Sequence, residues 1–232
     1  MSKQSWVIVS VVVLAVVTSI PQTRAAEPAF AEDFLIDKAD LASSGTNPYF
    51  ILEPGHQLVY KGGDEELIIT VLDETKMVDG VETRVVEERE SEGGRLVEIS
   101  RNFFAISRRN NGVFYFGEDV DTYNKKGEVS GHGGAWLAGV GGAKAGLMMP
   151  GIALLGARYY QEVAPGVAMD RAEITSVSDT LKVPAGSFDK VVKVQETTPL
   201  EPGVKEYKYY APGVGLLKDG DLLLVKHGRA GD

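Results

Sequence analysis

Short apolar runs separated by glycine-containing turns make up most of this chain from Tyr49 onward. In Leu67-Ile69-Val71 and in Tyr207-Tyr209, large apolar side chains occupy every second position. A period of two is typical of a β-strand that has one face on a core and the other in water. The pattern therefore predicts antiparallel strands joined by tight turns, with at most one or two short helices.

About ten strands are expected between residues 49 and 228, divided by turn residues. Asp79-Gly80 predicts a two-residue hairpin, because both positions tolerate a positive φ. Pro184-Ala185-Gly186-Ser187 and Asn110-Asn111-Gly112 mark two further turns. The strand candidates are 57–61, 65–72, 81–90, 95–107, 113–116, 157–162, 171–177, 180–183, 190–197, 205–210, 216–218 and 221–226.

These runs predict an all-β fold in which one antiparallel meander forms a strongly curved sheet or barrel. Ile68, Thr70 and Leu72 lie between the alternating apolar positions and are themselves mostly apolar. Part of the sheet is therefore expected to be covered on both faces. A two-sheet sandwich is the alternative. Residues 49–228 are expected to form a single domain, since a chain of about 200 residues usually builds one core.

The segment from Gly127 to Gly151 has a different texture, with nine glycines among a few large apolar residues. Glycine lowers the stability of helices and strands because it loses more conformational freedom than other residues on folding. We therefore expect a long structured loop here, folded over one mouth of the barrel.

An uncharged apolar run from Trp6 to Ile20 follows Lys3 and precedes Pro21. This arrangement, with small residues around Thr23-Arg24-Ala25, predicts a signal peptide over residues 1–26 and an exported protein, periplasmic or secreted. An uncleaved anchor is the alternative, but the run is shorter than the roughly 20 residues that span a bilayer. Residues 27–48 are expected to be a loose lead-in that contains one short helix over 33–41.

The amino-acid composition limits the classes of partner and site that the protein can have. The chain has no cysteine, which excludes disulfides, thiolate metal sites and a cysteine nucleophile. Its formal net charge is −9, and removal of Lys3 and Arg24 with the signal peptide would make it −11. Such a charge disfavours nucleic acids and anionic membrane surfaces. After cleavage, no second apolar stretch is long enough to form an integral membrane segment.

No standard catalytic motif is present, neither a Gly-x-Ser-x-Gly elbow nor a His-Glu-x-x-His helix, so the sequence predicts no catalytic residue. One constellation has metal-ligand chemistry: Glu118, Asp119, Asp121 and His132. Several carboxylates and one imidazole can together bind a divalent cation. A divalent cation is therefore the cofactor that these four residues would hold. If Val120 points inward, Asp119 and Asp121 point outward together, because side chains alternate along a strand. The alternative is a solvated acidic turn.

Aromatic residues gather on several of the expected strands and usually fill a core. Some of them must face the opposite side from their neighbours, where they would line a ligand cavity of the kind that small barrels hold. The candidates for ligand contact are Trp136, Tyr115, Tyr159 and Tyr209.

Three stretches carry a resemblance to a known group of proteins: Phe114–Asp121, Trp136–Gly151 and Pro199–Leu216. They resemble exported bacterial β-sheet proteins of unknown function, over about Tyr49 to Val225. The resemblance implies one β-sheet domain and no activity. The turn Tyr210-Ala211-Pro212-Gly213-Val214-Gly215 and the hairpin Val183–Phe188 are also similar to those of periplasmic lipid-handling half-barrels.

The leading functional hypothesis is a non-enzymatic, extracytoplasmic protein that binds an apolar or amphipathic small ligand inside its curved sheet. A divalent-metal-binding protein or metal-dependent enzyme centred on residues 118–132 is the second. A structural or interaction module that pairs through an edge strand is the third.

Overall fold

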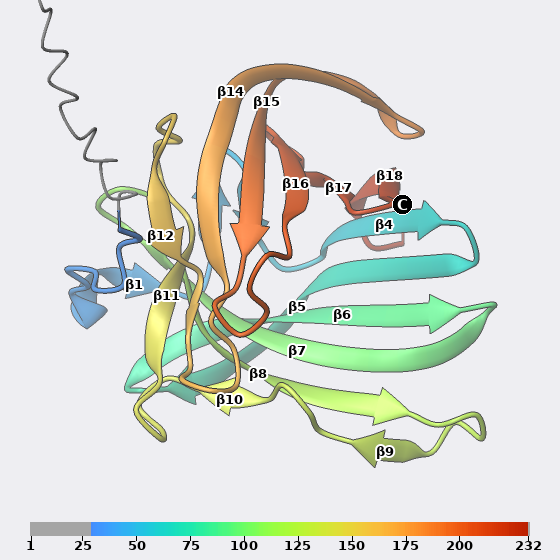
Figure 1. Ribbon diagram of the computed structural model, residues 1–232, viewed down its shortest axis with the longest axis horizontal. Helices are drawn as coiled ribbons and strands as arrows, with labels where there is room; N and C mark the ends of the chain where they lie inside the picture. Colours follow the sequence, from blue (N-terminus) through green and yellow to red (C-terminus); the bar gives the residue numbers. More distant parts are fainter. Residues whose placement is uncertain (1–28, 232) are drawn as a thin grey trace, which may run out of the picture.

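The computed structural model describes residues 29–231, and within them almost all regular structure is β-strand (Figure 1), which confirms the predicted all-β class. The one helical turn in this range is the 3-10 turn Lys38–Asp40, whereas a helix over 33–41 was expected. The residues before this turn have no regular structure apart from an isolated bridge between Ala31 and Tyr159. No helix in the described range is long and apolar enough to cross a membrane. The predicted signal peptide lies outside the described residues.

Residues 29–231 contain eighteen strands, several of them only two or three residues long. Their bounds are β1 Leu41–Ala42, β2 Gly45–Asn47, β3 Phe50–Leu52, β4 His56–Gly62, β5 Glu65–Val78, β6 Val81–Glu92, β7 Arg95–Ser107, β8 Val113–Tyr123, β9 Val129–Gly131, β10 Trp136–Leu137, β11 Lys144–Met149, β12 Arg158–Tyr160, β13 Glu162–Val163, β14 Arg171–Val183, β15 Gly186–Thr197, β16 Glu206–Ala211, β17 Gly215–Asp219 and β18 Leu222–Arg229.

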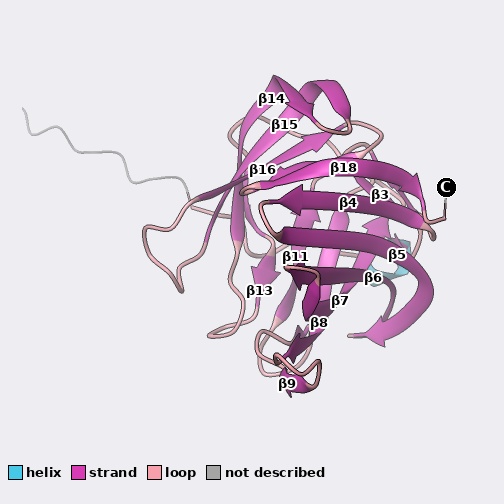
Figure 2. Ribbon diagram, turned by 90° about the vertical axis from the view of Figure 1, so that its right-hand side faces the viewer, coloured by secondary structure: helices cyan, strands magenta, loops and turns pink. Residues whose placement is uncertain are grey.

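Most strands join one antiparallel sheet in the order β12-β14-β15-β16-β17-β18-β4-β5-β6-β7-β8-β11-β13. The sheet curves until it is nearly closed as a barrel, as Figures 1 and 2 show from two sides. The expected strand number of about ten is too low. The additional strands are short pairings such as β1, β9 and β13, which show no alternation in the sequence because they span only one or two residue pairs.

A single extended segment, residues 158–163, brings the two ends of the sheet together. Its first half, β12, pairs with β14, and its second half, β13, pairs with β11. Between them, the backbone N–H groups of Gln161 and Glu162 both donate to the carbonyl oxygen of Asp170. Gly146 on β11 allows this approach, because a Cβ there would lie 2.1 Å from the carbonyl oxygen of Gln161.

The glycine-rich segment from Gly127 to Gly151 contains three strands, β9, β10 and β11, and each pairs with β8. The expected loop is thus interrupted by stretches that belong to the barrel wall, because the few non-glycine residues between the turns can pair with β8. Gly117 has a φ of 128°, and a Cβ there would lie 2.2 Å from the carbonyl oxygen of Trp136, so glycine is needed where β10 meets β8. A cover over the mouth stays a prediction.

The expected two-residue hairpin between β5 and β6 is confirmed. Asp79 and Gly80 have φ values of 49° and 76°, and Val78 pairs directly with Val81. Both positive φ values match the right-handed twist of the flanking strands.

Hairpin β14–β15 rises above the barrel and bends over it (Figures 1 and 2). Its far end rests on β18, where the N–H of Ala185 donates to the carbonyl oxygen of Leu224 over 3.0 Å. Phe188 lies edge-on to His227, with ring centroids 6.1 Å apart. Val183 and Val191 of the hairpin share a smaller apolar cluster with residues of β4, β17 and β18, which include Leu58.

Candidate functional site

The barrel interior is built from alternate residues on neighbouring strands. On β4 and β5, Leu58 lies opposite Ile69, and Ile69 lies opposite Glu88 on β6. Directly opposed residues of an antiparallel pair point to the same face of the sheet. Leu58, Ile69 and Glu88 therefore lie on the same face of the sheet. This face is apolar at Leu58 and Ile69 and acidic at Glu88.

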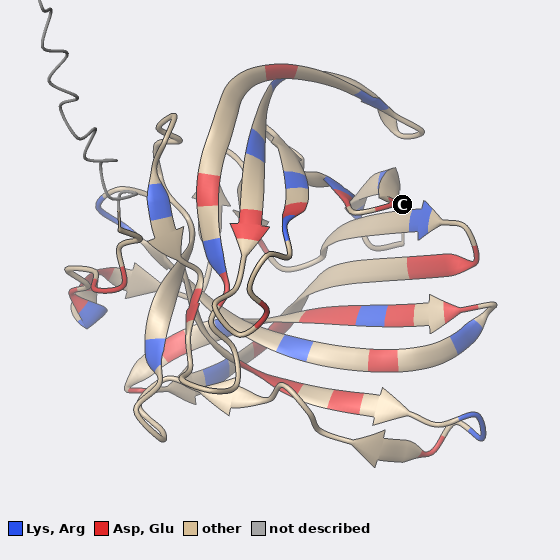
Figure 3. Cartoon of the chain, viewed as in Figure 1, with Lys and Arg blue, Asp and Glu red and all other residues tan. Residues whose placement is uncertain are grey.

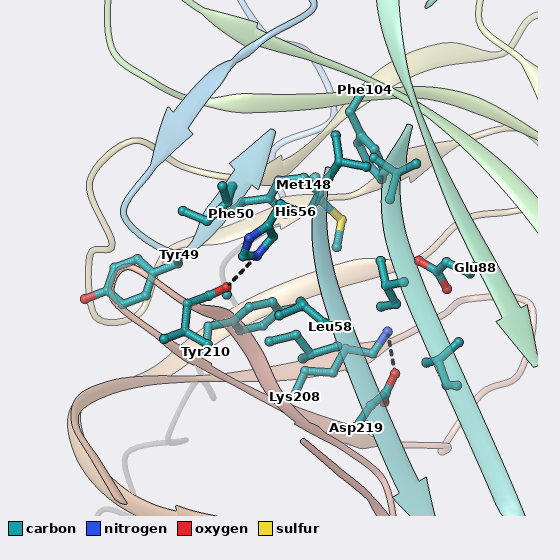
Figure 4. A pocket seen from close by; sticks show the side chains of 18 residues that line it. Tyr49, Phe50, His56, Leu58, Glu88, Phe104, Met148, Lys208, Tyr210 and Asp219 are labelled. Carbon is teal, nitrogen blue, oxygen red and sulfur yellow. Dashed lines mark hydrogen bonds and ion pairs between the residues drawn. The ribbon is translucent and has the colours of Figure 1, made fainter. Parts of the chain in front are cut away.

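A pocket of about 100 Å³ lies against this face, between β4–β6 and β16–β17 (Figure 4). Its apolar wall includes Ile69, Val71, Val86, Phe104 and Met148. Its polar lining is formed by Glu88, Lys208, Asp219 and His56. The pocket therefore has an amphipathic lining.

Lys208 of β16 is the centre of the polar end. Its ammonium nitrogen lies 3.0 Å from a carboxylate oxygen of Glu196 and 3.4 Å from one of Asp219. Lys208 and Asp219 are opposed across β16 and β17, and Lys208 lies opposite Val194 of β15, a core residue. Burial alone would lower the pKa of Lys208, but the charges of Glu196 and Asp219 raise it well above its usual range. Lys208 is therefore a permanent cation.

Glu88 faces Lys208 from the opposite wall (Figure 4). Burial, together with the charges of Glu90 and Asp219, raises the pKa of Glu88 to about 7, although the charge of Lys208 opposes the shift. Glu88 thus titrates near neutral pH, and its carboxyl is a hydrogen-bond donor when protonated and an acceptor when ionised.

Further carboxyl groups surround the same interior. Burial, together with the charges of Glu98 and Asp170, raises the pKa of Glu118 to about 7, although the nearby Tyr115 hydroxyl opposes the shift. Burial and the charge of Asp170 raise the pKa of Glu162 well above its usual range. The interior carboxyls therefore interact as one set of like charges rather than as separate ion pairs.

His56, the first residue of β4, closes the pocket on another side. Its Nε2 lies 3.1 Å from the carbonyl oxygen of Val214, and burial lowers its pKa. With Nε2 donating to that carbonyl, the ring is neutral and its second nitrogen is an acceptor.

Three of the four aromatic candidates lie inside the barrel. Tyr115 stacks on Phe104, with ring centroids 4.6 Å apart, and meets Trp136 edge-on at 5.3 Å. Tyr159 is 3% exposed, and its hydroxyl has no hydrogen-bond partner within residues 29–231. None of the three lines the pocket, and Tyr115 adjoins it through Phe104, which does line it.

Tyr209, the fourth candidate, lies on the outer face of β16, where the ammonium nitrogens of Lys193 and Lys218 lie 5.5 Å and 5.9 Å from its ring centroid. Its neighbour Tyr210 is the residue that lines the pocket. Because the two tyrosines are adjacent, alternation placed them on opposite faces but gave no indication of which face is inside.

The four metal candidates are divided between the two faces of β8. Glu118 lies with the interior carboxyls, whereas Asp119 faces outward in an ion pair of 2.6 Å with Lys76. Asp121 is also outside, where His132 Nδ1 lies 3.0 Å from its carboxylate. The expected outward direction of both aspartates holds, and Val120 is 5% exposed. Within the described residues, no group of three or more His, Asp or Glu side chains is arranged to hold a metal ion.

Sequence reasoning did not single out Glu88, Lys208 or Asp219. A signal was present for Glu88, since it lies two positions after Val86 in one strand and must share its face. Lys208 and Asp219 lacked such a signal, because their approach to Glu88 depends on closure of the barrel.

Comparisons with known proteins identified no relative of this chain. No family model, no curated protein and no solved structure matches the chain.

Proposed function

We propose that this protein binds a small amphipathic molecule in the pocket between β4–β6 and β16–β17. The observation that carries the proposal is the lining, in which Ile69, Val71 and Phe104 face the same space as Glu88 and Lys208. Ligand pockets are typically concave and mostly apolar, with a few polar groups that orient the ligand. The volume of about 100 Å³ is smaller than the engineered apolar cavity of about 150 Å³ that accepts benzene, so the pocket suits the end of a short chain rather than a whole ring.

The predicted export of the protein also supports this proposal. The apolar run Trp6–Ile20 predicts that the protein acts outside the cytoplasm, where a barrel without disulfides would carry or sense a small molecule. The likeness of two turns to those of periplasmic lipid-handling half-barrels agrees with an amphipathic ligand. We propose a binding role rather than catalysis.

A volume-filling substitution tests the pocket directly. Ile69→Phe places a larger side chain in the pocket, and we expect it to weaken binding of 1-hexanol at least tenfold, measured by isothermal titration calorimetry. The matched control is Ile68→Phe. Ile68 is the preceding residue of the same strand, and its side chain points to the other face of the sheet. Equal affinities of wild type and Ile69→Phe, or no binding of 1-hexanol to the wild type, would contradict the proposal.

A further inference from the structure

The polar side of the barrel interior carries many more carboxyl groups than cations. Besides Glu88 and Glu118, the carboxyls whose charges act on one another are Glu98, Glu162, Asp170, Glu196 and Asp219, together with the exposed Glu90. Glu90 and Glu98 lie directly opposite each other across β6 and β7. Lys208 is the ammonium that contacts this set, through Glu196 and Asp219. Figure 3 shows how acidic positions recur along β6, β7 and β8.

One of these carboxylates is buried and incompletely satisfied. Glu196 is 6% exposed; one of its oxygens pairs with Lys208, and Oε1 has no hydrogen-bond partner in residues 29–231. Glu196 also lines a second hollow together with Asp170 and Thr198. A buried carboxylate oxygen without a donor is rare in folded proteins, and it is normally explained by a water, an ion or a ligand group.

An ammonium group has the complementary chemistry. It carries a positive charge and three N–H donors, whereas a carboxylate accepts only. Hydrogen bonds between charged partners are shorter and stronger than those between neutral ones, and they strengthen further where water is excluded. A ligand carboxylate would meet the opposite situation, since it would add one more negative charge beside Glu88 and Asp219.

We infer that the ligand is a cationic amphiphile, a protonated aliphatic or aromatic amine. Its apolar body lies against Ile69, Val71 and Phe104, and its nitrogen lies near the carboxylates of Glu88 and Asp219, which line the same pocket. This inference rests on the proposed function and names the charge of the ligand for the same pocket. Lys208 remains paired with Glu196 and Asp219, so Glu88 is the acceptor for the incoming nitrogen.

Three probes of equal length and different charge test the inference: hexylamine, 1-hexanol and hexanoate. At pH 8, calorimetric titration of the full-length protein is expected to give a dissociation constant for hexylamine about tenfold below that for 1-hexanol, with hexanoate weakest. Glu88→Gln should reduce the preference for the amine over 1-hexanol to about threefold or less. The matched control Glu66→Gln removes the same charge from the outer face of β5, where Glu66 pairs with Lys61 at 3.1 Å, and should keep the full preference.

The outcomes separate the two ideas. Binding of 1-hexanol as tight as that of hexylamine, or tighter binding of hexanoate, would overturn the cationic ligand and leave the pocket proposal standing. Failure of all three probes to bind the wild type would overturn the proposed function itself. Circular dichroism of each variant shows whether a lost preference reflects a lost fold.

Discussion

At the residue scale, the unusual property of this barrel is a carboxyl group that titrates near neutrality. Burial raises the pKa of Glu88 to about 7, and Glu118, reached through the same interior, also has a pKa of about 7. A buried like-charge set costs folding free energy when it is ionised, because each carboxylate loses hydration and repels its neighbours. Such costs are typical of functional sites, where a bound partner can relieve them.

Stability should therefore depend on pH in a defined direction. Between about pH 4.5 and pH 7 the folded protein holds a proton on Glu88 that the unfolded chain has released, and it loses this proton as pH rises through about 7, so the free energy of unfolding falls as pH rises. Lys208 faces Glu88 and limits the loss, while Glu90, Asp219 and Glu118 increase it. We expect Glu88→Gln to match wild type at pH 5 and to exceed its stability by on the order of 2 kcal/mol at pH 8, measured by urea unfolding.

The difference between variant and wild type reports the ionisation of Glu88 together with its repulsion of neighbouring carboxyls such as Glu118. Identical pH profiles for the two proteins would show that Glu88 is not desolvated in solution. Glu66→Gln, on the outer face, serves again as the control and should leave the wild-type profile unchanged.

At the element scale, short irregular strands close the barrel. Segment 158–163 pairs with β14 and then with β11, and it changes partner at Gln161. Long strands such as β5 and β6 carry an alternating pattern that specifies their register. The closing strands are too short for such a pattern, so their position depends on close backbone contact at Gly146.

Gly146→Ala should open this seam. The added Cβ would overlap the carbonyl oxygen of Gln161, which belongs to the backbone and cannot rotate away. We expect a loss of about 3 kcal/mol in the free energy of unfolding and faster amide hydrogen exchange in β11 and β13.

Gly133→Ala is the control for this prediction, because no atom lies within 4 Å of a Cβ added there. The control should change stability by less than about 0.5 kcal/mol. Equal effects of the two substitutions would indicate that general backbone entropy, and not the seam, is responsible.

At the scale of the whole molecule, two apolar clusters of unequal size hold the sheet together. The larger fills the barrel, and the smaller joins hairpin β14–β15 to β4, β17 and β18. Regions with few buried apolar contacts open at lower free energy than the global core. The hairpin end is therefore expected to be the first part of residues 29–231 to open.

Phe188→Ala tests this order of opening. It removes the ring that meets His227 and packs against the smaller cluster. We expect amides of residues 181–191 to exchange at least tenfold faster while those of β6 and β7 change little, with a loss of about 2 kcal/mol or less in global stability. Uniform acceleration across all strands would show instead that the two clusters unfold as one unit.

The order of residues was enough to predict the all-β class, the Asp79-Gly80 turn and the outward direction of Asp119 and Asp121. Each of these depends on neighbours within one strand or turn, where alternation and φ preferences act locally. The closing strands, the polar end of the pocket and the inward direction of Tyr210 required the folded barrel. Period-two alternation tells which residues share a face, but the face that becomes the interior depends on how distant strands meet. Glu88 and Lys208 are therefore neighbours only because the curvature of the whole sheet brings β6 and β16 to opposite walls of one pocket.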